Sequence, residues 1–341
     1  MKKIILSLLA IGLVFSACRK KSSVEEQSEH SSVDIYAVGY EKNQQNKMVA
    51  KLWKNGVVTS LTDGRFNAVA NAVSVSGADV YVVGYEVNAA GKWVAKLWKN
   101  GVGTDLFEGG NSTAAHSVAV SGNDVYVVGY ESIGIRTISK LWKNAEVTVI
   151  SDGSISAPLR FVTVVDGDVY MTGSINGFAH LWKNGTASNI SSNIRSSGDA
   201  LAISENDVYV AGVESINEKK SAVLWKNGIP ERLSNDSDFS VEAGSVAISG
   251  EDVYVVGRVK SSTGYPGPVK LWKNGVESTL TNTFNTNYFT FKIAVSVFGN
   301  DVYIGDGDEG KAKIWKNGIA TNLTDGSYEA DINSIFLVPK Q

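Results

Sequence analysis

Cysteine, histidine and proline are scarce in this chain, whose 341 residues include one cysteine, three histidines and five prolines. The single cysteine is Cys18, so the rest of the chain can form no internal disulfide and must be stabilised by its own core. His30, His116 and His180 are far apart and are not accompanied by carboxylate clusters, so we expect no metal site. No Gly-x-Ser-x-Gly or Walker motif is present, and no cofactor is expected.

Strong charge of one sign is also lacking. The chain has 32 Lys and Arg against 35 Asp and Glu, a formal net charge of −3, which gives no support to nucleic-acid binding. After Cys18, no apolar run approaches the roughly 20 residues that span a bilayer. A membrane contact is therefore expected only through the N-terminus.

The N-terminus has the pattern of an export signal. Two lysines, an apolar run and two small residues precede the cysteine: Lys2, Lys3, residues 4–15, Ser16, Ala17 and Cys18. This ending resembles the bacterial lipobox, which implies that Cys18 is acylated and becomes the first mature residue. By the same resemblance, Lys20 argues against inner-membrane retention and favours an outer-membrane or surface address. An ordinary secretory signal is the alternative interpretation.

The segment that follows the signal is polar. Residues 19–33 have no apolar periodicity, which predicts a disordered tether between the signal over residues 1–18 and a folded domain over residues 34–341.

Two sequence motifs recur seven times in the folded domain. The run Leu/Ile-Trp-Lys-Asn-Gly/Ala contains Trp53, Trp98, Trp142, Trp182, Trp225, Trp272 and Trp315. The run Asp-Val/Ile-Tyr begins at Asp34, Asp79, Asp124, Asp168, Asp207, Asp252 and Asp301. Each repeat contains four strand patterns bounded by Gly or Asn, and both faces of the second strand are apolar. Sheets that are covered on both sides by their neighbours are typical of propeller blades.

The chain ends predict how the array closes. The domain begins on the second strand of a repeat, and residues 333–337 near its end align with residues 71–75, the first strand of another repeat. We therefore predict an all-β, seven-bladed β-propeller of four-stranded antiparallel blades, closed by the C-terminal strand joining the N-terminal blade. A monomer is expected.

The repeats resemble those of kelch-type and other bacterial propellers whose second strand ends in glycine, although they lack the kelch double glycine and the Trp-Asp pair of WD40 blades. Together with the lipobox, they resemble exported bacterial propeller lipoproteins with Trp-Lys-Asn-Gly repeats. The resemblance covers residues 34–341 and implies a fold and no activity.

Residues present in every repeat are interpreted as structural. The tryptophans should be buried, and the aspartates should be Asx-type turn residues. Glutamates that end the second strand should pair across strands with lysines two residues before the tryptophan. These glutamates are Glu41, Glu86, Glu131 and Glu214.

Candidate binding residues are those that differ between repeats. The positions eight residues before each second-strand aspartate should precede the innermost strands and so ring the propeller axis: Asn71, His116, Arg160, Asp199, Gly244 and Ile293, with Asn333 on the closing strand. Their polar members suit a small polar or anionic ligand. Variable loops add Tyr265 and Tyr288. Solubility of a channel mouth and neutral drift of loops explain the same patterns without a ligand.

These patterns favour a non-catalytic ligand-binding or protein-interaction module at the bacterial cell envelope. Its partner would be a glycan, a small polar ligand or an envelope protein. The alternatives are a carbohydrate-active enzyme with a site assembled from several blades, and a purely structural assembly component. The predicted ligand-binding residues are Asn71, His116, Arg160, Asp199, Tyr265 and Tyr288.

Overall fold

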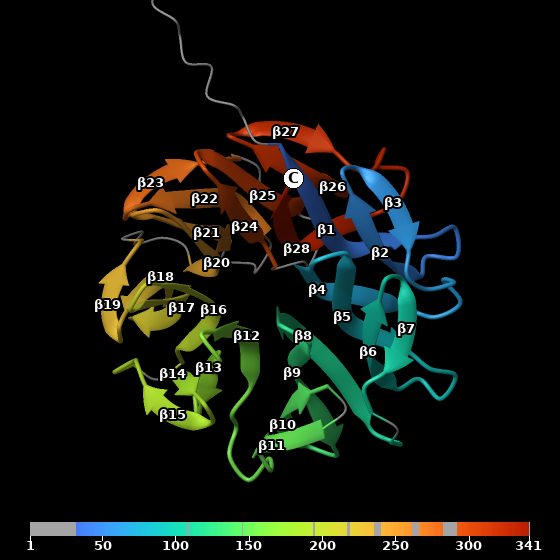
Figure 1. Ribbon diagram of the computed structural model, residues 1–341, viewed down its shortest axis with the longest axis horizontal. Coiled ribbons are helices and arrows are strands. Elements are labelled where there is room, and N and C mark those ends of the chain that lie inside the picture. The colour runs from blue at the N-terminus through green and yellow to red at the C-terminus, as the bar shows by residue number, and fades with distance from the viewer. Residues whose placement is uncertain are drawn as a thin grey trace, which may run out of the picture. The chain divides into compact units, whose positions relative to one another are not determined.

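The computed structural model describes residues 32–107, 109–144, 146–193, 195–216, 219–234, 240–260, 266–281 and 292–340. The unit that begins at Val33 contains seven four-stranded antiparallel sheets arranged in a ring, which confirms the predicted seven-bladed propeller (Figure 1). Its first strand begins one residue before the predicted domain start. Cys18, the predicted signal and residues 19–31 of the predicted tether lie outside the described residues.

The strands of each blade are given from the axis outward. Blade 1 contains β28 (Ala330–Pro339), β1 (Val33–Lys42), β2 (Met48–Lys54) and β3 (Val57–Ser60). Blade 2 contains β4 (Ala68–Ser76), β5 (Asp79–Val87), β6 (Trp93–Lys99) and β7 (Val102–Asp105). Blade 3 contains β8 (Ser112–Ser121), β9 (Asp124–Ile133), β10 (Arg136–Lys143) and β11 (Glu146–Ser151). Blade 4 contains β12 (Leu159–Val165), β13 (Asp168–Ile175), β14 (Phe178–Lys183) and β15 (Thr186–Asn189).

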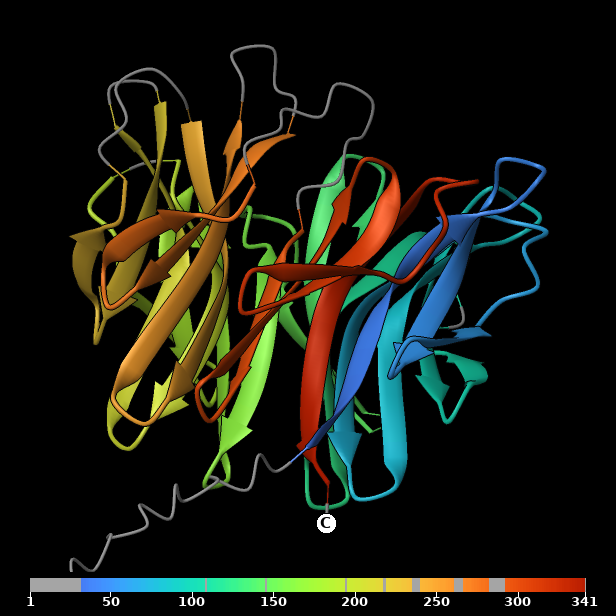
Figure 2. The ribbon, with the colours of Figure 1, turned by 90° about the horizontal axis from the view of Figure 1, so that it is seen from above.

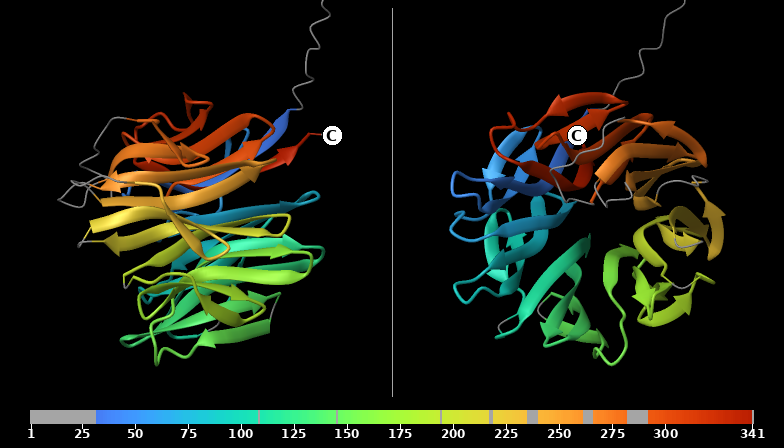
Figure 3. Two further views of the ribbon diagram at one scale, coloured as in Figure 1. Left: turned by 90° about the vertical axis from the view of Figure 1, so that its left-hand side faces the viewer. Right: turned by 180° about the vertical axis from the view of Figure 1, so that it is seen from behind.

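The remaining three blades follow the same order. Blade 5 contains β16 (Ser197–Ser204), β17 (Asp207–Ile216), β18 (Lys219–Lys226) and β19 (Ile229–Arg232). Blade 6 contains β20 (Ser240–Ser249), β21 (Asp252–Lys260), β22 (Pro266–Lys273) and β23 (Val276–Thr279). Blade 7 contains β24 (Ala294–Phe298), β25 (Asp301–Asp308), β26 (Lys311–Lys316) and β27 (Ile319–Asn322). The innermost strands face the axis in both views along it (Figures 1 and 3).

The closing strand is β28, as predicted. It pairs antiparallel with β1 from Val33 opposite Pro339 to Glu41 opposite Ala330. Blade 1 is therefore built from both ends of the described unit. This pairing gives the inner edge of β1 the backbone partners that an open array would leave exposed.

Among the described residues, the core consists of seven apolar clusters, one at each junction between neighbouring blades. Each cluster contains one repeat tryptophan that packs against the preceding blade; Trp98 of blade 2, for example, lies with Tyr36 and Val38 of blade 1. Trp53 of blade 1 packs on Ile314 of blade 7, so the last junction is like the others. All seven tryptophans are at most 4% exposed, which confirms their structural role. Each contributes on the order of 4–6 kcal/mol by area buried, an upper estimate.

A β-bulge interrupts the innermost strand in six blades. In blade 2 the pairing of β4 with β5 skips Asn71. The carbonyl oxygen of Val69, two residues before Asn71, points toward β5. A Cβ at Gly84 would collide with that oxygen of Val69. The glycine within the second strand of these blades is therefore required by the bulge.

The face that carries the first-to-second and third-to-fourth turns is nearly identical in every blade. In blade 2, Asn100 has a φ of 51°, and its side-chain Nδ2 donates to Asp79 Oδ1 at 2.8 Å. The same Asn–Asp bond, at 2.7–2.9 Å, occurs in all seven blades. The repeat aspartates thus link two hairpin turns, and their interpretation as Asx-turn residues was wrong. The Lys99 ammonium and the Asn100 amide hold the pKa of Asp79 below its usual range.

The predicted Glu–Lys pairs form in three blades. Glu41 and Glu86 each lie 3.3 Å from a lysine Nζ, and Glu131 forms a 2.5 Å pair with Lys140. Glu214 accepts from Asn193 Nδ2 at 2.9 Å instead. Within the described ranges, the structure contains no helix long and apolar enough to cross a membrane.

Candidate functional site

The positions predicted to ring the axis are the bulge residues of the innermost strands. Asn333, Asn71, His116, Arg160, Asp199 and Gly244 are the residues that the ladder to the second strand skips. They therefore lie within the innermost strands. This was predicted for Asn333, and the expectation that the other five precede these strands was wrong. It holds for Ile293, which directly precedes β24. A bulge re-aims its extra side chain, so equivalent residues from different blades come together.

Three bulge residues each link their own blade to the following blade at the axis. Asn333 Nδ2 donates to Ala70 O at 2.9 Å, and Asn71 Nδ2 donates to Ala115 O at 2.8 Å. His116 Nδ1 lies 2.9 Å from Leu159 O. In each case the acceptor is the residue just before the bulge of the following blade. Their side chains therefore have a structural role that the sequence did not reveal.

The geometry sets the tautomer of His116. A carbonyl oxygen only accepts, so Nδ1 carries the proton, and the neutral ring keeps Nε2 as an acceptor. Burial, then the Lys292 charge, lowers the pKa of His116 to about 3. The imidazole is therefore neutral at physiological pH and rests against Tyr130, with ring centroids 5.3 Å apart.

The next two bulge residues carry opposite charges. Arg160 Nε lies 3.8 Å from Asp199 Oδ1, and Ser197 Oγ donates to the same oxygen at 2.9 Å. The Arg160 side chain is 48% exposed. Burial raises the pKa of Asp199 to about 6, although Arg160 opposes the shift.

A lysine that was not predicted completes the ring. Lys292 Nζ donates to Asn71 Oδ1 at 2.9 Å, so blade 7 reaches past blade 1 to blade 2. Loss of bulk water around its ammonium, and then repulsion by Arg160, lower the pKa of Lys292 to about 7. A sequence signal existed, because the residue before the bulge position is small or apolar in the other blades: Ala70, Ala115, Leu159, Gly198, Ala243 and Ile332.

The structure thus brings together Asn71, His116, Arg160 and Asp199 of the predicted site. Tyr265 and Tyr288 lie outside the described residues. In the part of the chain that the structure describes, no three His, Cys, Asp or Glu side chains are grouped as metal ligands. The ring offers two cationic groups, a carboxylate and a neutral imidazole acceptor to a ligand at the axis.

A buried ion pair lies at the junction of blades 6 and 7. Asp306 occupies the position that is glycine in the other six blades, and Arg258 Nη2 donates to its carboxylate. Arg258 Nη1 also donates to Gly267 O at 3.2 Å. Burial raises the pKa of Asp306, and Arg258 opposes this shift. Elsewhere the position of Arg258 holds an aromatic or small residue, such as Tyr85.

Comparisons with known proteins support the fold alone. No family model matches the chain, and no curated protein matches it. A puromycin-hydrolyzing peptidase of Mycobacterium tuberculosis superposes with a TM-score of 0.54 at 12% identity over 84% of this chain. An acylaminoacyl peptidase of Pyrococcus horikoshii, at 12% identity over 85% of this chain, has a TM-score of 0.46. TolB from Acinetobacter baumannii, at 14% identity, has a TM-score of 0.47 over 87% of this chain and 79% of its own.

The chain spans about half the length of the two peptidases, 53% and 52% respectively. The likeness to the first of these peptidases shows a propeller fold. None of these likenesses assigns a specific function to this chain.

Proposed function

We propose that this protein is an exported, lipid-anchored binding module of the bacterial envelope that holds a small anionic ligand at the propeller axis. The observation that carries the proposal is the position of Arg160 and Lys292. Both belong to what we call the bulge ring, which is the six bulge residues together with Lys292, and their mutual repulsion contributes to the lowered pKa of Lys292. An anion between them would relieve that repulsion and accept hydrogen bonds from both side chains.

The other bulge residues support a fixed geometry for this site. Asn71 and His116 are held by bonds to backbone carbonyls of the following blade. The Lys292 ammonium is held in turn by Asn71. Side chains that are already ordered lose little further entropy on binding, which favours affinity for a small ligand.

The test is a titration of the full chain with small carboxylates and inorganic phosphate by isothermal calorimetry. A His116→Ala/Arg160→Ala double variant should lose binding, and Arg136→Ala, which removes an exposed arginine from the loop-side start of β10, should not. A Tyr265→Ala/Tyr288→Ala variant tests whether the ligand binds on the variable loops instead of at the axis. Binding lost only in that variant would place the ligand on the loops. Turnover of a bound compound would instead indicate an enzyme, and no binding by any anion would favour a structural component.

A further inference from the structure

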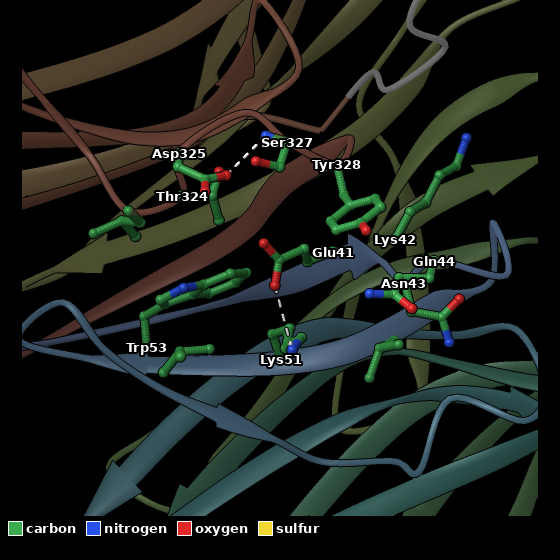
Figure 4. A pocket seen from close by; sticks show the side chains of 13 residues that line it. Glu41, Lys42, Asn43, Gln44, Lys51, Trp53, Thr324, Asp325, Ser327 and Tyr328 are labelled. Carbon is green, nitrogen blue, oxygen red and sulfur yellow. Dashed lines mark hydrogen bonds and ion pairs between the residues drawn. The ribbon is translucent and has the colours of Figure 1, made fainter.

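A pocket of about 550 Å³ lies away from the bulge ring, where blade 7 meets blade 1. One wall is the end of β1 and the start of β2, and the other is the connection from β27 to β28 (Figure 4). Trp53 and Val49 are among its lining residues but are almost fully buried, and Tyr328 and Glu41 line it as well (Figure 4). A volume of this order lies within the range of small-molecule sites.

A small change in a repeated turn distinguishes this junction from the next one. Residues 323–328, Leu-Thr-Asp-Gly-Ser-Tyr, align with residues 61–66, Leu-Thr-Asp-Gly-Arg-Phe, at the junction of blades 1 and 2. At that other junction, Arg65 Nε lies 2.6 Å from Asp63 Oδ2. At the pocket the short Ser327 replaces this arginine, and Asp325 Oδ1 accepts the Ser327 amide at 2.7 Å. The carboxylate of Asp325 is therefore oriented without a guanidinium beside it.

The charges that line the pocket are balanced. Lys51 Nζ lies 3.3 Å from Glu41 Oε2, and Lys42 Nζ lies 2.6 Å from Glu329 Oε2. Because both lining lysines are already paired with carboxylates, an anion would find no cation available to it. Backbone and side-chain hydrogen bonds from Ser327 hold the pKa of Asp325 below its usual range, so this carboxylate is an ionised acceptor.

Exposed aromatic surface is the third feature of the pocket. Tyr328, which lines the pocket, is 39% exposed, so its ring is accessible to a ligand. An aromatic ring next to carboxylate and amide acceptors suits a sugar, which has an apolar C–H face and hydroxyl groups at its edge. A neutral ligand of this kind matches the balanced charge better than any ion does.

We propose that this pocket binds a neutral sugar residue of a glycan. The sugar packs its C–H face on Tyr328, and its hydroxyl groups donate to Glu41 and Asp325. The site lies between blades 7 and 1, so the proposal goes beyond the anion site at the axis and does not depend on it.

The experiment uses maltose, cellobiose and N,N′-diacetylchitobiose as probes of the full chain, with saturation-transfer NMR and calorimetry. Tyr328→Ala should weaken binding of the responding disaccharide at least about tenfold. Tyr328→Phe keeps the ring and should stay within about threefold of the unchanged protein. Phe66→Ala is the matched control, because Phe66 is the equivalent residue of the next junction and is 38% exposed. It should leave sugar binding unchanged.

Three results would overturn the proposal. They are no binding of any of the three disaccharides at millimolar concentration, equal loss in Phe66→Ala and Tyr328→Ala, or loss of sugar binding in Arg160→Ala with none in Tyr328→Ala. Anion binding, measured on the same variants, should be unaffected by Tyr328→Ala. Each of the two proposals can therefore be refuted without refuting the other.

Discussion

Lys292 Nζ donates a hydrogen bond of 2.9 Å to Asn71 Oδ1, and this contact joins blade 7 to blade 2 across the position of blade 1. It places a second cation near Arg160. Loss of water around the ammonium, and then repulsion by Arg160, lower the pKa of Lys292 to about 7. Asp331 is the negative group that partly offsets this repulsion. The protonation of Lys292 is therefore sensitive to pH in the physiological range.

The first prediction is that anion binding at the axis weakens as pH rises above 7. A bound anion favours the ammonium form, so binding above pH 7 must take up a proton, and affinity falls by up to about tenfold per pH unit. Below pH 6, protonation of Asp199 removes a repelling charge and should strengthen binding. Calorimetry between pH 5.5 and 8.5 measures this. Lys292→Gln should flatten the profile above pH 7, and an unchanged slope in that variant would refute the role of Lys292.

The second prediction concerns His116 and stability in acid. The folded-state pKa of about 3 lies below the ordinary value of 6.5, so the unfolded chain binds more protons between these values. The resulting loss of stability begins as pH falls below 6.5 and reaches on the order of 2 kcal/mol at pH 5. In His116→Asn, the new side chain has an amide Nδ2 that can donate as those of Asn71 and Asn333 do, and it cannot titrate. Denaturant unfolding should show it close to the unchanged protein at pH 7 and more stable at pH 5. Equal acid sensitivity of the two proteins would contradict the burial of a neutral imidazole.

The third prediction concerns the ion pair at the junction of blades 6 and 7. Removing one partner should lower the free energy of unfolding more than replacing both. Arg258→Tyr alone leaves the Asp306 carboxylate buried without its cation and should destabilise by about 3–5 kcal/mol. The Arg258→Tyr/Asp306→Gly double variant restores the residues that other blades have at these positions. Its destabilisation should be smaller than that of Arg258→Tyr alone. Additive losses in a double-mutant cycle would show that the two side chains act independently.

The fourth prediction tests closure of the ring. Deleting residues 330–341 removes β28, so β1 loses its ladder and the cluster around Trp53 and Ile335 opens. The melting temperature should fall by more than about 10 °C. Removing only residues 340 and 341 is the matched control and should have little effect. If both truncated proteins had the same melting temperature, β28 would not be the strand that closes the ring.

The fifth prediction concerns the lipid anchor. Cys18 is the only cysteine in the chain, so Cys18→Ser should abolish metabolic labelling by a fatty-acid probe and release the exported protein from the membrane fraction. Cys18→Ala should behave in the same way. Membrane association that survives both substitutions would remove the basis for a lipid anchor.

The architecture could be predicted because it repeats. Seven copies of the tryptophan motif and of the Asp-Val/Ile-Tyr motif predicted seven blades, and the partial repeats at the chain ends predicted that β28 joins blade 1. Burial of the tryptophans followed from the same repetition, since each must fill one junction. Local rules of strand periodicity and turn composition were sufficient for this, because every unit carries the same local information.

The repeated aspartates mark where local reasoning failed. Asp79 was assigned to a turn within its own hairpin, yet its partner is Asn100, at the tip of a different hairpin of the same blade. Only the register of β5 against β6 brings these two tips together. An Asx turn and a cross-hairpin bond have the same sequence signature, and pairing of the strands decides between them.

The sequence by itself determined the number of blades, the tryptophan of each core junction and the positions that come together at the axis, because these depend on periodicity. The tertiary structure decided what the axial residues do. Closure of the ring sets His116 against the Leu159 carbonyl and brings Lys292 from 221 residues away to Asn71. Both contacts cross blade boundaries, and hydrogen bonds and charge repulsion depend on distances that no pattern within one repeat contains.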